Sequence, residues 1–250
     1  MKINRNVATL LVAFCTLAHT QAAPVTDFSD LNFWGSGSNQ SGLIINWDDG
    51  STSESMAWGF NWSGPATMAD MIQSLAAEDS RLFARLDSTT AFGLSLFGLG
   101  YEKGASSFGI TGATADGGAS ADPVTFVNGV DDLNTNNADT EEPDSSVGSV
   151  ASNSGDLYLE GWLDTGFWGS SNGGVSTSLP TSVDWTANGG ATATTLQNDG
   201  WYAFIYKPGF AGDNVPNGPI TQAIPEPSTI LMLVAGLGVI SWLRRVTFKS

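Results

Sequence analysis

An uninterrupted apolar run near the C-terminal end sets the first limit on how this chain can fold. The run covers 14 residues, from Ile230 to Leu243. Its flanks hold a Pro-Glu-Pro tripeptide before it and basic residues after it, namely Pro225, Glu226, Pro227, Arg244, Arg245 and Lys249. At a rise of about 1.5 Å per residue the run is short for a bilayer core of about 30 Å. However, it has no amphipathic face, and a basic cluster of this kind is typical of the cytoplasmic end of a membrane segment. We therefore expect a single transmembrane helix at about 229–243 rather than a buried core helix.

These three features, in this order, resemble a known signal. Pro225 and Pro227 exclude a helix and separate the tail from what precedes it. Residues 224–250 as a whole resemble the PEP-CTERM sorting signal of Gram-negative bacteria. The resemblance implies recognition by an exosortase, a membrane cysteine protease-transpeptidase that cuts near the motif. It also implies a membrane-anchored precursor and then a cell-surface or extracellular product, in lineages that often make exopolysaccharide and biofilm. An ordinary C-terminal membrane anchor is the alternative.

The N-terminal residues 1–22 have the layout of a secretory signal peptide. Lys2 and Arg5 form a positive region, Val7 to Ala18 an apolar region, and small residues follow. We expect signal peptidase to cut after Ala22, because a cut after Ala23 would leave Pro24 at the first mature position. The chain is then exported across the inner membrane.

Removal of this peptide restricts the chemistry that remains. The only cysteine, Cys15, and the only histidine, His19, lie within it. The mature protein would therefore have no thiol nucleophile, no histidine base, no cysteine or histidine metal site and no disulfide. Between the two terminal signals stand 24 acidic and 4 basic residues, a net charge near −20. Such a surface repels nucleic acid, so we expect no nucleic-acid partner.

The exported part, 23–207, is expected to be mainly β-structure. Leu43 to Trp62 predicts a hairpin around Asp48-Asp49-Gly50, with Trp58, Phe60 and Trp62 on one face of its second strand. Residues 91–101 and 200–207 predict further strands. Residues 169–174 predict a loop, and the proline- and glycine-containing stretch 208–223 a linker to the tail.

Helical spacing follows the hairpin. Met68, Met71, Ile72 and Leu75 form an apolar stripe, with Thr67 as N-cap and Asp70 completing a capping-box variant. Leu82, Phe83 and Leu86 predict a second short turn of helix, so that one or two helices pack at about 67–86. The fold class expected is α+β, mainly antiparallel β with these helices. A β-sandwich is the alternative.

A second resemblance covers most of the exported part. Trp58-Gly59-Phe60-Asn61-Trp62-Ser63-Gly64, Asp70-Met71-Ile72 and Asp79-Ser80-Arg81-Leu82-Phe83 are similar to a pattern in uncharacterised exported bacterial proteins, W-G-[FY]-x-W-x-G, D-M-[LI], D-x-R-[LF]. That group of proteins has no assigned activity. The resemblance therefore implies export and a shared architecture, but no chemistry.

One acidic stretch starts like a calcium loop. Asp132, Asn134 and Asn136 supply oxygen ligands at alternate positions. Asn137 stands where such a loop needs glycine, and Pro143 where it needs a bidentate glutamate. A looser calcium site and a plain acidic loop both stay open, and we expect no other cofactor.

Three functions are compatible with this sequence. The first is a non-enzymatic, exosortase-sorted surface or matrix protein with a structural or adhesive role, for which we assign no catalytic residue. The second is a carbohydrate- or calcium-binding module, since eight tryptophans lie in the exported part. The third is a carboxylate-dependent hydrolase, although no motif selects a pair of carboxylates.

Overall fold

The computed structural model describes residues 23–90, 93–104, 107–111, 124–132, 150–161, 166–188, 190–208 and 214–223. Within these ranges the chain forms three sheets, the helix α2 (Met68–Glu78) and the short 3-10 helix η1 (Phe28–Asp30). The large sheet comprises β1 (Phe33–Gly35), β2 (Asn39–Asp48), β3 (Ser53–Trp62), β10 (Gly166–Val175), β11 (Thr186–Ala187), β12 (Gly200–Pro208) and β13 (Ile220–Gln222). The second sheet comprises β4 (Leu82–Thr90), β5 (Gly93–Tyr101), β7 (Val130–Asp132) and β9 (Leu157–Glu160), and β6 (Ile110–Thr111) pairs with β8 (Val150–Ala151).

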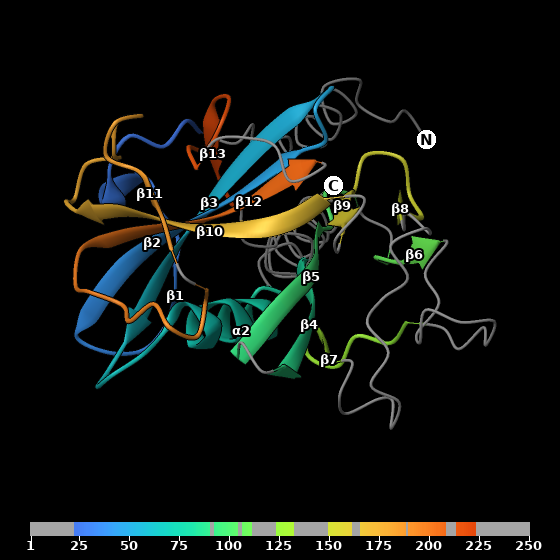
Figure 1. Ribbon diagram of the computed structural model, residues 1–250, viewed down its shortest axis with the longest axis horizontal. Helices are drawn as coiled ribbons and strands as arrows, with labels where there is room; N and C mark the ends of the chain where they lie inside the picture. The colour runs from blue at the N-terminus through green and yellow to red at the C-terminus, as the bar shows by residue number, and fades with distance from the viewer. Residues whose placement is uncertain are drawn as a thin grey trace, which may run out of the picture.

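The large sheet is built on the predicted hairpin. β2 and β3 run antiparallel from the pair Asn39–Trp62 to the pair Asp48–Ser53. Their turn is closed by the Asp49 carboxylate, which accepts hydrogen bonds from the backbone of Ser51 and Thr52. β12 adds in parallel to β2, and β10 adds antiparallel to β12. On the far side of β3 lie β1 and β13, both parallel to it (Figure 1).

Both faces of the central strands are buried. Trp58, Phe60 and Trp62 on β3 point into one core, as the sequence predicts, together with alternate residues of β2 and β12. The intervening residues Ala57 and Ile44 point into a second core. That core is covered by an N-terminal segment containing η1 and by Trp185. Six of the eight tryptophans expected in the exported part are buried in these cores: Trp47, Trp58, Trp62, Trp168, Trp185 and Trp201.

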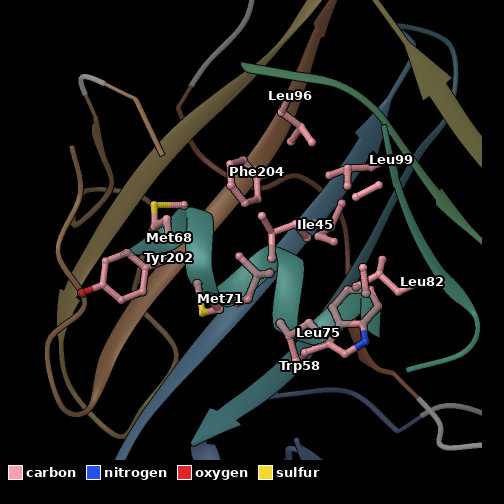
Figure 2. Close-up of a cluster of buried hydrophobic side chains, with 14 of the residues drawn as sticks. Ile45, Trp58, Met68, Met71, Leu75, Leu82, Leu96, Leu99, Tyr202 and Phe204 are labelled. Carbon is pink, nitrogen blue, oxygen red and sulfur yellow. The ribbon is translucent and has the colours of Figure 1, made fainter. Parts of the chain in front are cut away.

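Helix α2 fills the first core. Met68, Met71 and Leu75 are fully buried, and Figure 2 shows them in one cluster with side chains of β2, β3, β4, β5 and β12. The helix starts at the predicted N-cap. The Thr67 side chain accepts from the Asp70 N–H, and the Asp70 carboxylate accepts from the Thr67 N–H. The sheets also meet directly where the Trp47 indole donates to the Leu99 carbonyl, at 2.8 Å.

The second helix expected near residues 82–86 is wrong, because Leu82–Thr90 forms the strand β4. Leu82 and Leu86 are four residues apart, a spacing that fits one face of a helix and one face of a strand equally. The structure settles this through Ala84, which is buried in the same core, and Arg85, which lies on the opposite face and bonds to a neighbouring strand. The residues of the second resemblance therefore lie on the strand β3, the capped helix α2 and the start of the strand β4.

Two further expectations need correction. Residues 169–174 lie within β10 rather than in a loop. Their small side chains leave room for neighbours, since a Cβ at Gly169 would meet the Lys207 side chain at 2.8 Å. The stretch 208–223 is not a linker throughout, because β13 belongs to the large sheet. The mainly-β, α+β class is confirmed, but both main sheets mix parallel with antiparallel pairs.

The capping box of α2 gives a direct test of this fold. Replacing Thr67 with alanine (Thr67→Ala) removes the acceptor for the Asp70 N–H, and we expect a loss of about 1 kcal/mol in the free energy of unfolding. Urea denaturation of the exported part measures this loss. Thr177→Ala, at an exposed position, is the control and should change stability by less than about 0.5 kcal/mol. Equal effects of the two variants would contradict the cap.

Candidate functional site

The described chain ends on a strand edge that leads into the sorting segment. β13 pairs with β3 through Ile220–Ser55, Thr221–Met56 and Gln222–Ala57. Ala223 follows directly and is fully buried. Its N–H donates to the Ala57 carbonyl at 2.9 Å, and its carbonyl accepts from the Asn32 side-chain amide at 2.7 Å. The chain is therefore held by the sheet up to residue 223.

The N-terminal end of the described chain lies against the same strand. The Val25 N–H donates to the Ile220 carbonyl and the Gln222 N–H donates to the Ala23 carbonyl, each at 2.9 Å. Pro24 and Thr221 are thus antiparallel partners. β13 is bound on both of its edges, by β3 and by residues 23–25. The residues just after the expected signal peptide and those just before the expected sorting signal are neighbours in the fold.

The sorting residues themselves lie beyond this edge. Pro225, Glu226, Pro227, Arg244, Arg245 and Lys249 lie outside the described residues, as does the helix expected at about 229–243. Among the helices of the described ranges, none has the length and apolar character needed to cross a membrane. The N-terminal residues 1–22 are likewise outside these ranges.

A buried ion network lies on the outer face of the second sheet. The Arg85 side chain, on β4, is 1 % exposed, and its guanidinium contacts Asp131 of β7 at 3.1 Å and Glu160 of β9 at 2.5 Å. The Tyr158 hydroxyl donates to the other Glu160 oxygen at 2.9 Å. Three strands from distant parts of the chain are therefore joined by one arginine.

The electrostatics of this network favour a charged Arg85 and a neutral Tyr158. Burial alone would lower the pKa of Arg85, but the charges of Glu160, Tyr158 and Asp131 and a hydrogen bond to Glu160 outweigh burial and raise it. Burial, followed by the charge of Glu160, raises the pKa of Tyr158 well above its ordinary value. Asp131 and Glu160 are thus engaged with a permanent cation rather than facing each other across open space. The arrangement joins strands β4, β7 and β9 through one buried side chain.

Sequence reasoning missed this network. Arg85 is one of only four basic residues between the two terminal signals, and that scarcity was the one available hint. Its partners are 46 and 75 residues further along the chain. Only the pairing of β7 and β9 with the β4–β5 hairpin brings them together.

The tryptophans expected either in the core or on a sugar-binding surface are largely in the core. Besides the six that are buried, Trp34 is half-buried and packs against the first core, and Trp162 lies outside the described residues. Trp58 also donates its indole N–H to the Asp79 carboxylate at 2.9 Å. The conspicuous aromatic pattern of the sequence is therefore an internal feature of the fold.

Of the calcium candidates, only Asp132 is described. It ends β7, whereas Asn134 and Asn136 lie outside the described residues. Within the described ranges, no group of three or more Asp, Glu, His or Cys side chains is arranged to hold a metal ion. Calcium binding by this loop stays a prediction.

An open pocket of about 240 Å³ lies beside the turn of the central hairpin, where Asp49, Glu54 and Asp156 line it together with Trp47. The Thr52 N–H, the Ser51 hydroxyl and the Ser51 N–H lower the pKa of Asp49 to about 2. The amino group of Lys103 pairs with Glu54 at 2.8 Å, and the Lys103 N–H donates to Asp156 at 2.9 Å. The acids of this pocket thus hold local turns and a surface ion pair.

Two ion pairs of contrasting burial allow the network to be tested. Arg85→Met leaves two buried carboxylates without their cation, and we expect a loss of about 3–5 kcal/mol in the free energy of unfolding. The matched control, Lys103→Met, breaks a pair whose side chains are both 39 % exposed, and should cost less than about 1 kcal/mol. Chemical denaturation of both variants measures the difference. Comparable small losses would show that the network does not hold the second sheet.

Comparison with known proteins adds one finding to this geometry. Searches of curated proteins and of solved structures found no significant match for the chain. A family model described as the PEP-CTERM protein-sorting motif matches residues 223–245. The match begins at Ala223, the last residue that the structure describes. The chain therefore carries a PEP-CTERM protein-sorting motif, which marks it as an exported, exosortase-sorted protein with a C-terminal membrane-anchoring sorting signal.

Proposed function

We propose that this protein is a non-enzymatic component of the cell surface or extracellular matrix of a Gram-negative bacterium, with a structural or adhesive role. The observation that carries the proposal is the direct continuity between a folded domain and the sorting motif. Ala223, the first residue of the motif match, is buried and bonded on both sides in the large sheet. The sorting signal would thus deliver a domain whose last described residue, Ala223, is also the first residue of the motif match.

The positions of the tryptophan and carboxylate side chains support a structural role over a carbohydrate-binding module or a carboxylate-dependent hydrolase. A carbohydrate-binding module needs exposed flat rings, but most of the tryptophans are packed inside. A carboxylate-dependent hydrolase needs two carboxylates across a cleft, but the buried Asp131 and Glu160 are both bonded to Arg85. Exopolysaccharide is the partner that we propose outside the cell, because the resemblance of the tail points to lineages that make it.

The sorting part of the proposal is tested by the motif. In a host that has an exosortase, replacing Pro225, Glu226 and Pro227 by alanine in the full chain should leave an unprocessed, membrane-bound form. Cell fractionation and mass spectrometry of the mature ends detect it. Pro219→Ala, at an exposed position shortly before the motif, is the control and should be processed normally. Normal processing of the triple variant would refute recognition through this tripeptide.

The structural role is tested by loss and restoration. Deleting the gene should weaken cell attachment or matrix cohesion, and the full chain should restore it. A version ending at Ala223, which retains β13 but lacks the sorting signal, should be secreted and should not restore attachment. If deletion leaves attachment unchanged and instead alters the chain length of the polysaccharide, the hydrolase alternative replaces this proposal.

A further inference from the structure

The last strand of the domain is part of a clasp that involves both ends of the described chain. We define the edge clasp as residues 23–25, Asn32, Ala57 and 220–223. Residues 23–25 and β3 bind the two edges of β13, while Asn32 and Ala57 bind Ala223. The bonds to residues 23–25, Asn32 and Ala57 use backbone groups of residues 220–223. The clasp therefore fixes the backbone that immediately precedes the sorting motif.

A second anchor lies further back along the same segment. The Asn217 N–H donates to the Asn46 side chain at 3.1 Å, and its amide donates to the Asp48 carboxylate at 2.9 Å. The Ser55 hydroxyl donates to the Asn217 carbonyl at 2.7 Å. The chain before residues 220–223 is thus attached to the sheet independently, at Asn217.

The position of the clasp conflicts with substrate binding by a processing enzyme. Enzymes that recognise extended peptides bind their backbone hydrogen-bonding groups, and Ala223 already uses its N–H and carbonyl within the fold. Two residues of extended chain reach at most about 7 Å, so Pro225 cannot move far from the sheet while Ala223 stays bound. A bulky membrane enzyme and the folded edge would compete for the same segment.

We propose that the edge clasp must open before the exosortase processes the motif, so that the opening of β13 regulates sorting. This inference rests on exosortase sorting of the chain. The rate of processing is then proportional to the fraction of molecules in which residues 220–223 have left the sheet. Strengthening the clasp slows sorting, and weakening it accelerates sorting, with an unchanged motif.

A disulfide across the clasp tests the proposal in the full chain. Val25 and Ile220 are opposite each other, one position from the Pro24–Thr221 pair, and the Val25 N–H donates to the Ile220 carbonyl. Hydrogen-bonded partners on antiparallel strands have Cα atoms about 5.5 Å apart, a separation that suits a disulfide. In the double variant V25C/I220C, oxidation in the periplasm should reduce processing to less than about a tenth of the wild-type rate. A reductant should restore it. Pulse-labelling and the ratio of precursor to product measure the rate.

Two controls accompany the disulfide. I110C/A151C places a cysteine pair across β6 and β8, away from the clasp, and should be processed like the wild type in the oxidised state. The wild-type chain with the same reductant shows any effect on the enzyme itself. Processing of oxidised V25C/I220C at the wild-type rate would overturn the proposal.

A variant without cysteines tests the opposite direction. Asn32→Ala removes the hydrogen bond to the Ala223 carbonyl, and processing should become about fivefold faster, as the loss of one hydrogen bond implies. Asn153→Ala removes a similar amide-to-carbonyl bond, to Ser107, far from the clasp and should leave the rate unchanged. If Asn32→Ala is processed at the wild-type rate or more slowly, the proposal is wrong, whatever the disulfide variant does.

These outcomes are distinct from a failure of sorting itself. If the chain is not an exosortase substrate, the alanine replacement of Pro225, Glu226 and Pro227 leaves processing unchanged. If it is a substrate but the clasp has no role, that replacement blocks processing while the locked and weakened clasps are processed like the wild type.

Discussion

The burial of both faces of the central strands is the constraint on which the rest of the structure depends. β2, β3 and β12 all place large apolar side chains in the first core, and Ile44 of β2 and Trp201 and Ile205 of β12 lie in the second, so neither face can be left to water. One core is closed by α2 and the second sheet. The other core is covered by the first and the last described segments of the chain. Val25 and Phe28 of the first segment lie in this core, and Ile220 of the last segment packs against it. Covering this second face therefore brings residues 23–31 and 215–223 together.

The location of the sorting motif follows from that closure. Because the segment before the motif is needed to cover and extend the large sheet, the fold continues to Ala223 and the motif match starts there. The N-terminal residues 23–25 complete the same edge. In a precursor that carries a signal peptide and a membrane-anchoring tail, both would leave the domain from neighbouring positions. The signal peptide and the sorting signal would then both be attached at one edge of the large sheet.

Local signals in the sequence predicted a large part of this fold. The hairpin followed from alternating residues around Asp49-Gly50, and α2 from its apolar stripe and from Thr67 and Asp70. These features depend on residues close together in the chain. The sorting motif was equally local, since its tripeptide, apolar run and basic cluster stand in one stretch, and the family match confirms it.

Features that depend on distant partners could not be predicted in this way. The spacing of Leu82 and Leu86 fits a helix and a strand equally. The contacts of Arg85 with Asp131 and Glu160, which lie on other strands, are formed only in the folded sheet. The prolines and glycines near residues 208–223 are typical of a linker. Bonds from Asn217 and Ala223 to residues more than 160 positions earlier nevertheless hold part of it in the sheet. The parallel pairing of β12 with β2 likewise cannot be predicted from turn residues or from hydrophobic periodicity.

Hydrogen exchange at the amides of Gln222 and Ala223 tests the central claim most directly. Both amides donate to backbone carbonyls, Gln222 to Ala23 and Ala223 to Ala57, at 2.9 Å. The measurement is made on a chain covering residues 23–223 and, separately, on one that starts at residue 26. The account predicts slow exchange at both amides in the first chain and faster exchange at Gln222 in the second, where its acceptor is missing. Exchange at both amides as fast as in an unstructured peptide would contradict the account and return residues 208–223 to the role of a linker.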